Sequence, residues 1–249
     1  MNQNAEPIQI LFHSKNGIKS NINNSAEVDF YFNTIAGDNQ THIYLKPIHV
    51  TIPYSFYQTN STNNYLRYTI NNSITNIYIP EGNYNINDLI SYLKLNMNGF
   101  TITYNRINNK LTFTHSTNDF LISPFSTCLK FLGLKNTLNS TNRTLQSEFP
   151  ITVLSTHCIC IYTTIHTSFL NTSQGEKIQN LLLTIPIDIN PNGVIIYKDN
   201  LSSINTNDNL FNSIGFRLCD ENGNLLNLNG MEWSILFELQ FVDFVSDNI

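Results

Sequence analysis

Short runs of β-branched and aromatic residues, separated by Asn, Gly, Ser or Pro, dominate this chain, and such runs are typical of strands. The clearest of them span residues 27–32, 101–104, 110–114 and 233–241. In the last run every second residue is hydrophobic: Trp233, Ile235, Phe237, Leu239 and Phe241. Successive side chains of a strand point to opposite faces, so this alternation predicts one face in the core and one that is at least partly polar.

The turns between these runs predict antiparallel pairing. Residues 105–110, Asn-Arg-Ile-Asn-Asn-Lys, read as the connection of a hairpin between two strands. The dipeptide Asn-Gly tolerates the positive φ angles of tight reversals. It recurs at Asn16-Gly17, Asn98-Gly99, Asn192-Gly193, Asn222-Gly223 and Asn229-Gly230.

Two segments depart from the strand pattern. Residues 85–98 have Asn85 or Asn87 as a possible N-cap, apolar residues at spacings of three and four, and Gly99 placed to end a helix. Residues 126–132, followed by Gly133, predict a second, shorter helix on the same capping argument.

These elements predict an all-β fold, an antiparallel β-sandwich with one or two short inserted helices, because a sheet with one apolar face must bury it against another layer. Sandwiches of this length commonly form one domain. We therefore expect a single domain over residues 1–249, with a short N-terminal arm at about residues 1–25. We find no long extra segment after the strand at Trp233, so we expect no additional domain.

Charge is scarce in this sequence, and its balance excludes several partners. Charged residues make up 12% of the chain, the net charge is −5, and no run of Lys or Arg occurs, so we expect no direct contact with nucleic acid. The longest apolar stretches, such as residues 181–187, are too short to span a bilayer. Residues 1–10 lack the pattern of a signal peptide, so we expect synthesis in the cell without a secretory signal.

Candidate chemistry is sparse, and we expect no enzyme. Four common catalytic and nucleotide-binding signatures are absent from the sequence. The four cysteines are too few and too unevenly spaced for a disulfide scaffold, so we interpret them as free thiols. The best metal candidate is His157-Cys158-x-Cys160, whose thiols share one face of a strand. Structural zinc needs four ligands, so a core strand is the better interpretation.

Three further groups of residues are candidate sites. Residues 220–224 resemble the start of a calcium loop, but Leu225 and Met231 stand where the loop needs Gly and Glu, which favours a turn at Asn222-Gly223. Asp243 and Asp247 suit an acid/base pair, although a solvated terminus is more usual. Sugar binding by aromatic faces and amides is permitted at Asn64-Tyr65 and Asn83-Tyr84, where edge packing is the commoner role.

An ordered set of short motifs runs along nearly the whole chain. It begins with Ser14-Lys15-Asn16 and continues through residues 45–57, 78–84 (Tyr-Ile-Pro-Glu-Gly-Asn-Tyr) and 131–134 (Phe-Leu-Gly-Leu). It ends with residues 216–223, 226–230 and 233–235, the last being Trp-Ser-Ile. In this order the chain resembles the penton, or minor capsid, proteins of virophages and Polinton-type double-stranded DNA viruses.

That resemblance implies a single jelly roll of eight strands in two facing sheets. It further implies a homopentamer at each fivefold vertex of an icosahedral virion, with the major capsid protein as neighbour. From the absence of signature motifs we expect no catalytic, cofactor-binding or metal-binding residue and no cofactor. The alternatives are another minor capsid or cement protein, or a glycan-binding attachment module.

Overall fold

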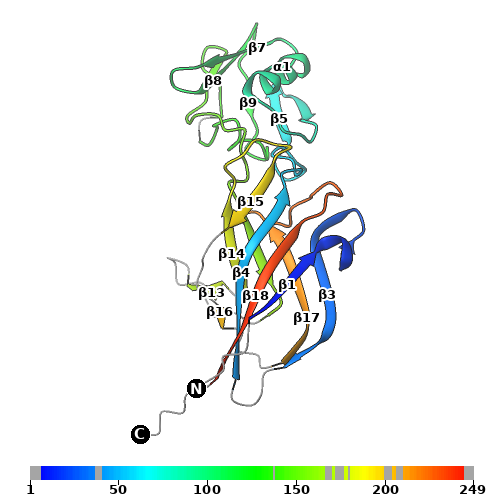
Figure 1. Cartoon of the computed structure of the whole chain (residues 1–249). Helices are drawn as coiled ribbons and strands as arrows, with labels where there is room; N and C mark the ends of the chain where they lie inside the picture. Colours follow the sequence, from blue (N-terminus) through cyan, green and yellow to red (C-terminus); the bar gives the residue numbers. More distant parts are fainter. Residues whose placement is uncertain are drawn as a thin grey trace. The chain divides into compact units, whose positions relative to one another are not determined.

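The computed structural model describes residues 7–36, 41–136, 138–165, 170–171, 177–178, 180–198, 204–205 and 210–243 (Figure 1). Contacts between residues divide the chain into two compact units. One comprises residues 1–56 and 156–249, and the other, which we call the inserted unit, comprises residues 57–155.

The first sheet of the larger unit joins both ends of the described chain. Its strands lie in the order β1 (Ile8–His13), β18 (Ser234–Asp243), β4 (Thr41–Pro53) and β15 (Val194–Lys198), with β16 (Ile204–Asn205) also paired to β4. Every pairing in it is antiparallel. The first and last of these strands in the sequence, β1 and β18, are therefore neighbours (Figure 1).

The second sheet contains the remaining long strands of this unit. Their order is β14 (Leu181–Pro186), β11 (Cys158–Thr163), β17 (Leu210–Cys219), β3 (Asn24–Ala36) and β2 (Ile18–Asn21). Along the chain, the strands move back and forth between the two sheets, which is the winding of a jelly roll. The predicted all-β jelly-roll sandwich is confirmed, and we call this part the jelly-roll unit. The 3-10 turn η1 (Ser14–Asn16) and the short pair β12 (Leu170–Asn171) and β13 (Lys177–Ile178) complete it.

Aromatic side chains from both sheets meet in the core of the jelly-roll unit. Phe216 in β17 stacks on Phe237 in β18 with ring centroids 5.6 Å apart and an angle of 11° between the planes. Phe12, Phe30 and Trp233 lie around the Phe216 ring at 5.6, 6.0 and 5.7 Å. The predicted alternation in the last strand is confirmed, since Ile235, Phe237 and Leu239 are all buried.

Trp233 is fixed by its polar atom as well as by its ring. The indole Nε1–H donates to the carbonyl oxygen of Ser25 at 2.6 Å, and the side chain is 1% exposed. A buried indole N–H without a partner would oppose folding. This bond therefore holds the start of β18 against β3.

The inserted unit lies between β4 and β11 in the sequence and has its own core. It contains two small sheets, one of β6 (Ser73–Tyr78), β5 (Tyr65–Ile70) and β9 (Leu121–Ile122), and one of β10 (Thr144–Gln146), β8 (Lys110–His115) and β7 (Phe100–Asn105). A second cluster of buried apolar residues, including Leu66, Leu89 and Phe113, lies entirely within this unit. The predicted hairpin at residues 105–110 is confirmed as the β7–β8 connection.

One of the two predicted helices forms. The helix α1 (Ile86–Asn96) begins at Asn85, whose Oδ1 accepts hydrogen bonds from the backbone N–H groups of Asn87 and Asp88. The helix buries Leu89, Ile90 and Leu93. Among the described residues, no helix is long and apolar enough to cross a membrane.

The helix predicted at residues 126–132 does not form. This segment is a series of turns that contains one helical bond, from Leu132 N–H to the Cys128 carbonyl at 2.9 Å. The backbone then closes a tighter contact, from Gly133 N–H to the Lys130 carbonyl at 3.2 Å, with Gly133 at φ +70°. Cys128, Phe131 and Leu132 are nevertheless buried. The apolar spacing that predicted a helix therefore reflects the packing of these turns against the core.

The single domain predicted over residues 1–249, with a short arm at about residues 1–25, stays a prediction. Within the chain, residues 57–155 form a compact unit with its own buried cluster. Apolar alternation indicates that a strand has a buried face, but it does not indicate which core buries that face, so the sequence pattern did not predict this second cluster. In the described part of the predicted arm, Ile8–His13 and Ile18–Asn21 pair within the two sheets.

We expect replacement of Phe216 by Ala to lower the free energy of unfolding of the jelly-roll unit by about 3–5 kcal/mol, because the ring is fully buried between the two sheets. The fluorescence of Trp233, the single tryptophan of the chain, reports on this unit during denaturant titration. The control is Tyr31→Ala in β3, since Tyr31 is 70% exposed, and its effect should stay within about 0.5 kcal/mol. Equal losses in both variants would contradict the packing described.

Candidate interaction surfaces

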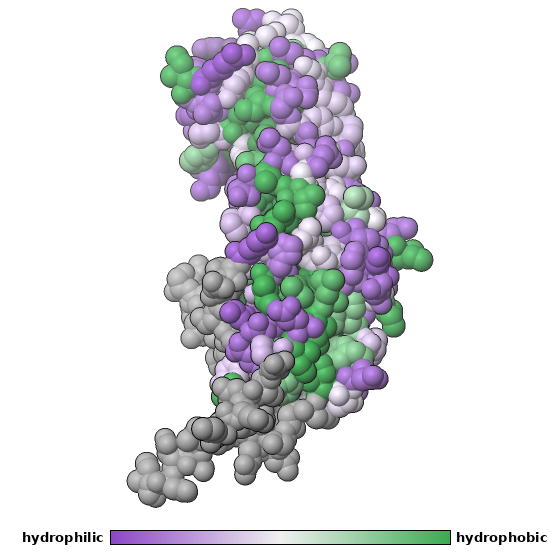
Figure 2. Space-filling model, viewed as in Figure 1, coloured by the Kyte–Doolittle hydropathy of each residue, from purple (hydrophilic) through white to green (hydrophobic). Residues whose placement is uncertain are grey.

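The outer face of the first sheet carries exposed apolar side chains. Leu11, Val194 and Ile196 are 62%, 49% and 58% exposed, and Leu236 is half-buried beside Leu11 in the register. His49 and Thr51 of β4 lie between the Leu11–Leu236 pair and the two residues of β15. We call the four apolar residues the apolar face. Figure 2 shows hydrophobic side chains gathered over β1 and β18. The outer face of β18 also carries Ser234, Glu238 and Gln240, so the at least partly polar face predicted for this strand is confirmed. The exposed apolar side chains of β15 were not predicted from the sequence, and the available signal was its apolar residues at both odd and even positions.

The outer face of the second sheet has a different character. Glu27 in β3 and Arg217 in β17 are cross-strand partners, and Arg217 Nε lies 3.0 Å from Glu27 Oε1. Asp29 and Tyr31 follow on the same face of β3, and both are exposed. The two outer faces therefore differ: the first carries exposed apolar side chains among polar ones, and the second carries the Glu27–Arg217 ion pair.

Charge is divided unequally between the two units. The inserted unit has seven Lys and Arg against four Asp and Glu, a net charge of +3. The rest of the chain has six against fourteen, a net charge of −8. The overall charge of −5 hides this difference, which appears once the unit boundaries are known.

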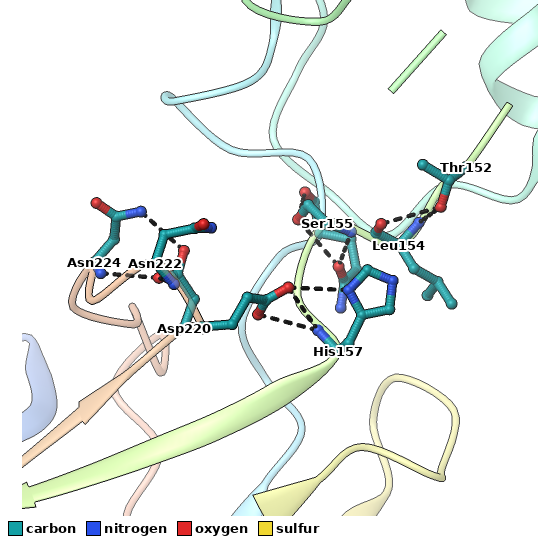
Figure 3. Close-up of polar contacts among 9 residues, drawn as sticks. Thr152, Leu154, Ser155, His157, Asp220, Asn222 and Asn224 are labelled. Atoms are coloured by element: carbon teal, nitrogen blue, oxygen red, sulfur yellow. Dashed lines mark hydrogen bonds and ion pairs between the residues drawn. The ribbon is translucent and has the colours of Figure 1, made fainter. Parts of the chain in front are cut away.

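The residues of the metal candidate take separate roles. The His157 ring nitrogen Nδ1 lies 2.9 Å from Glu221 Oε1, so this nitrogen is engaged by a carboxylate (Figure 3). Cys158 and Cys160 share the outer face of β11, and Cys219 of β17 lies opposite Cys160. Within the described residues, no three His, Cys, Asp or Glu side chains lie together as ligands for an ion.

The calcium-like segment forms a turn, as the sequence predicted. Asp220 Oδ1 accepts hydrogen bonds from the backbone N–H groups of Asn222 and Asn224 at 2.9 and 2.8 Å (Figure 3). Its Oδ2 accepts a third bond from Asn224 Nδ2 at 2.9 Å. Gly223 adopts φ +81°, a conformation that glycine reaches without strain. The Asp220 carboxylate thus stabilises the turn itself.

The other acidic candidate falls partly outside the described residues. Asp243 is the last residue of β18, and Asp247 lies beyond the part of the chain that the structure describes.

The two Asn-Tyr pairs proposed for sugar binding are used within the inserted unit. Asn64 Nδ2 donates to the Ile79 carbonyl at 3.0 Å, and the Tyr65 hydroxyl donates to Asn76 Oδ1 at 2.8 Å. Asn83 Oδ1 accepts from the Gln58 backbone at 2.8 Å, and the Tyr84 hydroxyl donates to the Pro80 carbonyl at 3.0 Å. Burial raises the pKa of Tyr84, and the nearby Tyr92 adds to the effect.

Hydrogen bonds tie together the two ends of the inserted unit. The Ser155 backbone N–H donates to Gln58 Oε1 at 2.6 Å, and the Ser155 hydroxyl donates to the Gln58 carbonyl at 2.5 Å (Figure 3). Gln58 is 2% exposed. Ends fixed side by side allow a segment to fold on its own within a longer chain.

A cleft of about 540 Å³ that sequence reasoning missed lies in the inserted unit. It is lined by Asn85, Ile86, Asn87, Tyr104, Arg106 and Val153. The available signal was the cationic Arg106 in an Asn-rich hairpin connection, two residues after Tyr104.

Comparisons with known proteins identify a solved structure with a similar fold. No protein-family model and no curated protein sequence matches the chain. The solved structure of the mavirus penton protein matches with a TM-score of 0.52 and 12% identity, covering 96% of this chain and 100% of that one. The chain has the fold of a virophage penton protein.

The penton fold extends over both units, because 96% coverage cannot be reached without residues 57–155. A chain in the structure of the Sputnik virophage matches with a TM-score of 0.48 and 10% identity, covering 94% of this chain and 98% of that one. The match to the mavirus penton protein confirms the predicted resemblance to virophage pentons at the level of the fold.

We expect the four free cysteines to react slowly in the native protein. Burial raises the pKa of Cys128 to about 12, and burial together with the neighbouring Cys160 raises that of Cys158 to about 11. The thiolate is the reactive form, so at pH 8 these two thiols should be at least about 100-fold less reactive than ordinary cysteine. Titration with a chromogenic disulfide before and after denaturation measures this. One thiol equivalent that reacts equally fast in both states would contradict it.

Proposed function

We propose that this chain is a non-catalytic structural protein of a viral capsid, the penton that closes the fivefold vertices as a homopentamer. The observation that carries the proposal is the penton fold, matched over 96% of this chain and the whole length of the mavirus penton protein. Fold alone does not imply function, so the surfaces of the jelly-roll unit must supply the remaining support.

The two unlike outer faces of the jelly-roll unit support a ring. In a closed ring each copy meets its neighbours through two different surfaces. We propose that the apolar face of one copy packs on the outer face of the second sheet of the next. Lys46, Lys198 and Glu238 give the first face a small positive excess, while Glu27, Asp29 and Arg217 give the second a small negative one.

Charge also supports the remaining partners. We propose the major capsid protein as the neighbour of the ring in the virion, and no direct contact with the genome. A jelly-roll unit with a net charge of −8 would be repelled by nucleic acid phosphates. A different minor capsid or cement position is the alternative, and oligomer number separates the two.

Native mass spectrometry of the purified chain tests the proposal. We expect a homopentamer, and we expect Ile196→Asp to shift it to monomer, because a carboxylate in a desolvated apolar contact costs several kcal/mol. The matched control is Ile22→Asp, since Ile22 lies in a turn of the same unit and is 85% exposed.

Two outcomes would contradict this account. A stable trimer, or a monomer at all concentrations, would exclude the proposed penton role and favour another position in the capsid shell. A pentamer that survives Ile196→Asp but not Ile22→Asp would keep the oligomer and exclude the apolar face as its interface.

A further inference from the structure

The cleft of the inserted unit is built from three segments. The first turn of α1 contributes Asn85, Ile86 and Asn87, the β7–β8 hairpin contributes Tyr104 and Arg106, and Val153 completes the wall. Figure 1 shows α1 and the ends of β7 and β8 in the same part of this unit. The cleft has a volume of about 540 Å³ and is wide open to solvent.

The hairpin that carries Arg106 is held by its own asparagines. Asn105 Oδ1 accepts from the Ile107 backbone at 2.8 Å, and Asn108 Oδ1 accepts from the Lys110 backbone at 3.1 Å. The Tyr104 hydroxyl donates to Asn109 Oδ1 at 2.5 Å, which holds the hydroxyl end of the side chain against the hairpin. The backbone that carries Arg106 therefore loses little conformational entropy when a ligand binds.

No ion pair among the described residues includes the Arg106 guanidinium. The ion pairs among the described residues are Lys19–Glu232, His157–Glu221 and Arg217–Glu27, and all three lie in the jelly-roll unit. The nearest acidic residue in the sequence of α1, Asp88, accepts a hydrogen bond from Asn85 Nδ2 at 2.5 Å instead. An arginine stays charged at all physiological pH values, so this one is free for an anion.

The net charge of the inserted unit independently favours an anionic ligand. This unit carries +3 although the whole chain carries −5. A local positive excess raises the concentration of anions at the surface and the rate at which they arrive.

The remaining lining selects among anions. The Tyr104 ring, Ile86 and Val153 offer an apolar surface, which a small inorganic anion cannot use but the C–H face of a sugar ring can. The Asn87 side chain is exposed at the rim and can hydrogen-bond sugar hydroxyls, whereas the Asn85 amide is committed to capping α1. Aromatic, amide and guanidinium groups together match a sugar that bears a carboxylate.

We propose that the Tyr104–Arg106 cleft binds an acidic sugar, with the carboxylate paired to Arg106 and the apolar face of the ring against Tyr104. The site would give a capsid protein a means of contacting acidic glycans on a cell or particle surface. It does not depend on the oligomeric state of the jelly-roll unit.

Ligand-observed NMR and calorimetry on the full chain test the proposal, with four probes: sialyllactose, a glucuronate-containing tetrasaccharide, neutral lactose and inorganic phosphate. We expect one of the two acidic sugars to bind at least about tenfold more tightly than lactose and phosphate, from one charge-assisted pair plus ring stacking. Comparison of the two acidic sugars shows whether the bound carboxylate belongs to a sialic acid or to a glucuronate.

Three variants locate the binding. Arg106→Ala should weaken the acidic sugar at least about tenfold, and Arg106→Lys should weaken it less because it keeps the charge but loses the planar fork. The matched control is Lys94→Ala, which removes one positive charge from an exposed position of α1 away from the cleft and should leave binding unchanged. Circular dichroism verifies folding of each variant.

Three results would overturn the proposal: no binding of either acidic sugar at millimolar concentration, equal binding of lactose or phosphate, or an equal loss in Arg106→Ala and Lys94→Ala. Native mass spectrometry of the same samples keeps this test separate from the capsid proposal, since either can fail while the other stands.

Discussion

The burial of two sheet faces against each other is the interaction on which the rest of the molecule depends. Phe216 from one sheet and Phe237 from the other stack at its centre, and Trp233 closes one side with its N–H bonded to Ser25. Strands from both ends of the described chain, β1 and β18, pair to complete the first sheet. The core therefore forms only when residues more than 200 positions apart meet, such as Ile8 and Leu239.

This constraint leaves the outer faces and the long connections free to carry function. The connection from β4 to β11 contains a unit with its own buried cluster, closed at its ends by Gln58 and Ser155. Because that unit is stabilised by its own core, its surface can differ in charge from that of the jelly roll. The opposite net charges, +3 and −8, follow this division.

The sequence predicted local structure better than organisation. The alternation at Trp233 to Phe241, the cap at Asn85 and the Asp220 turn are local features, and the structure confirms each. The helix expected at residues 126–132 failed because apolar spacing alone does not distinguish a helix from packed turns. The division into two units and the cleft around Arg106 depend on which strands share a core, and that information is not contained in any single segment.

The central claim, that this jelly roll closes the vertex of a capsid, is tested most directly by electron cryomicroscopy of the particle that contains it. The account predicts five copies of the jelly-roll unit around each fivefold axis, with the apolar face of Leu11, Val194, Ile196 and Leu236 buried against the next copy. Density for this chain at any position other than the fivefold vertices would contradict the claim.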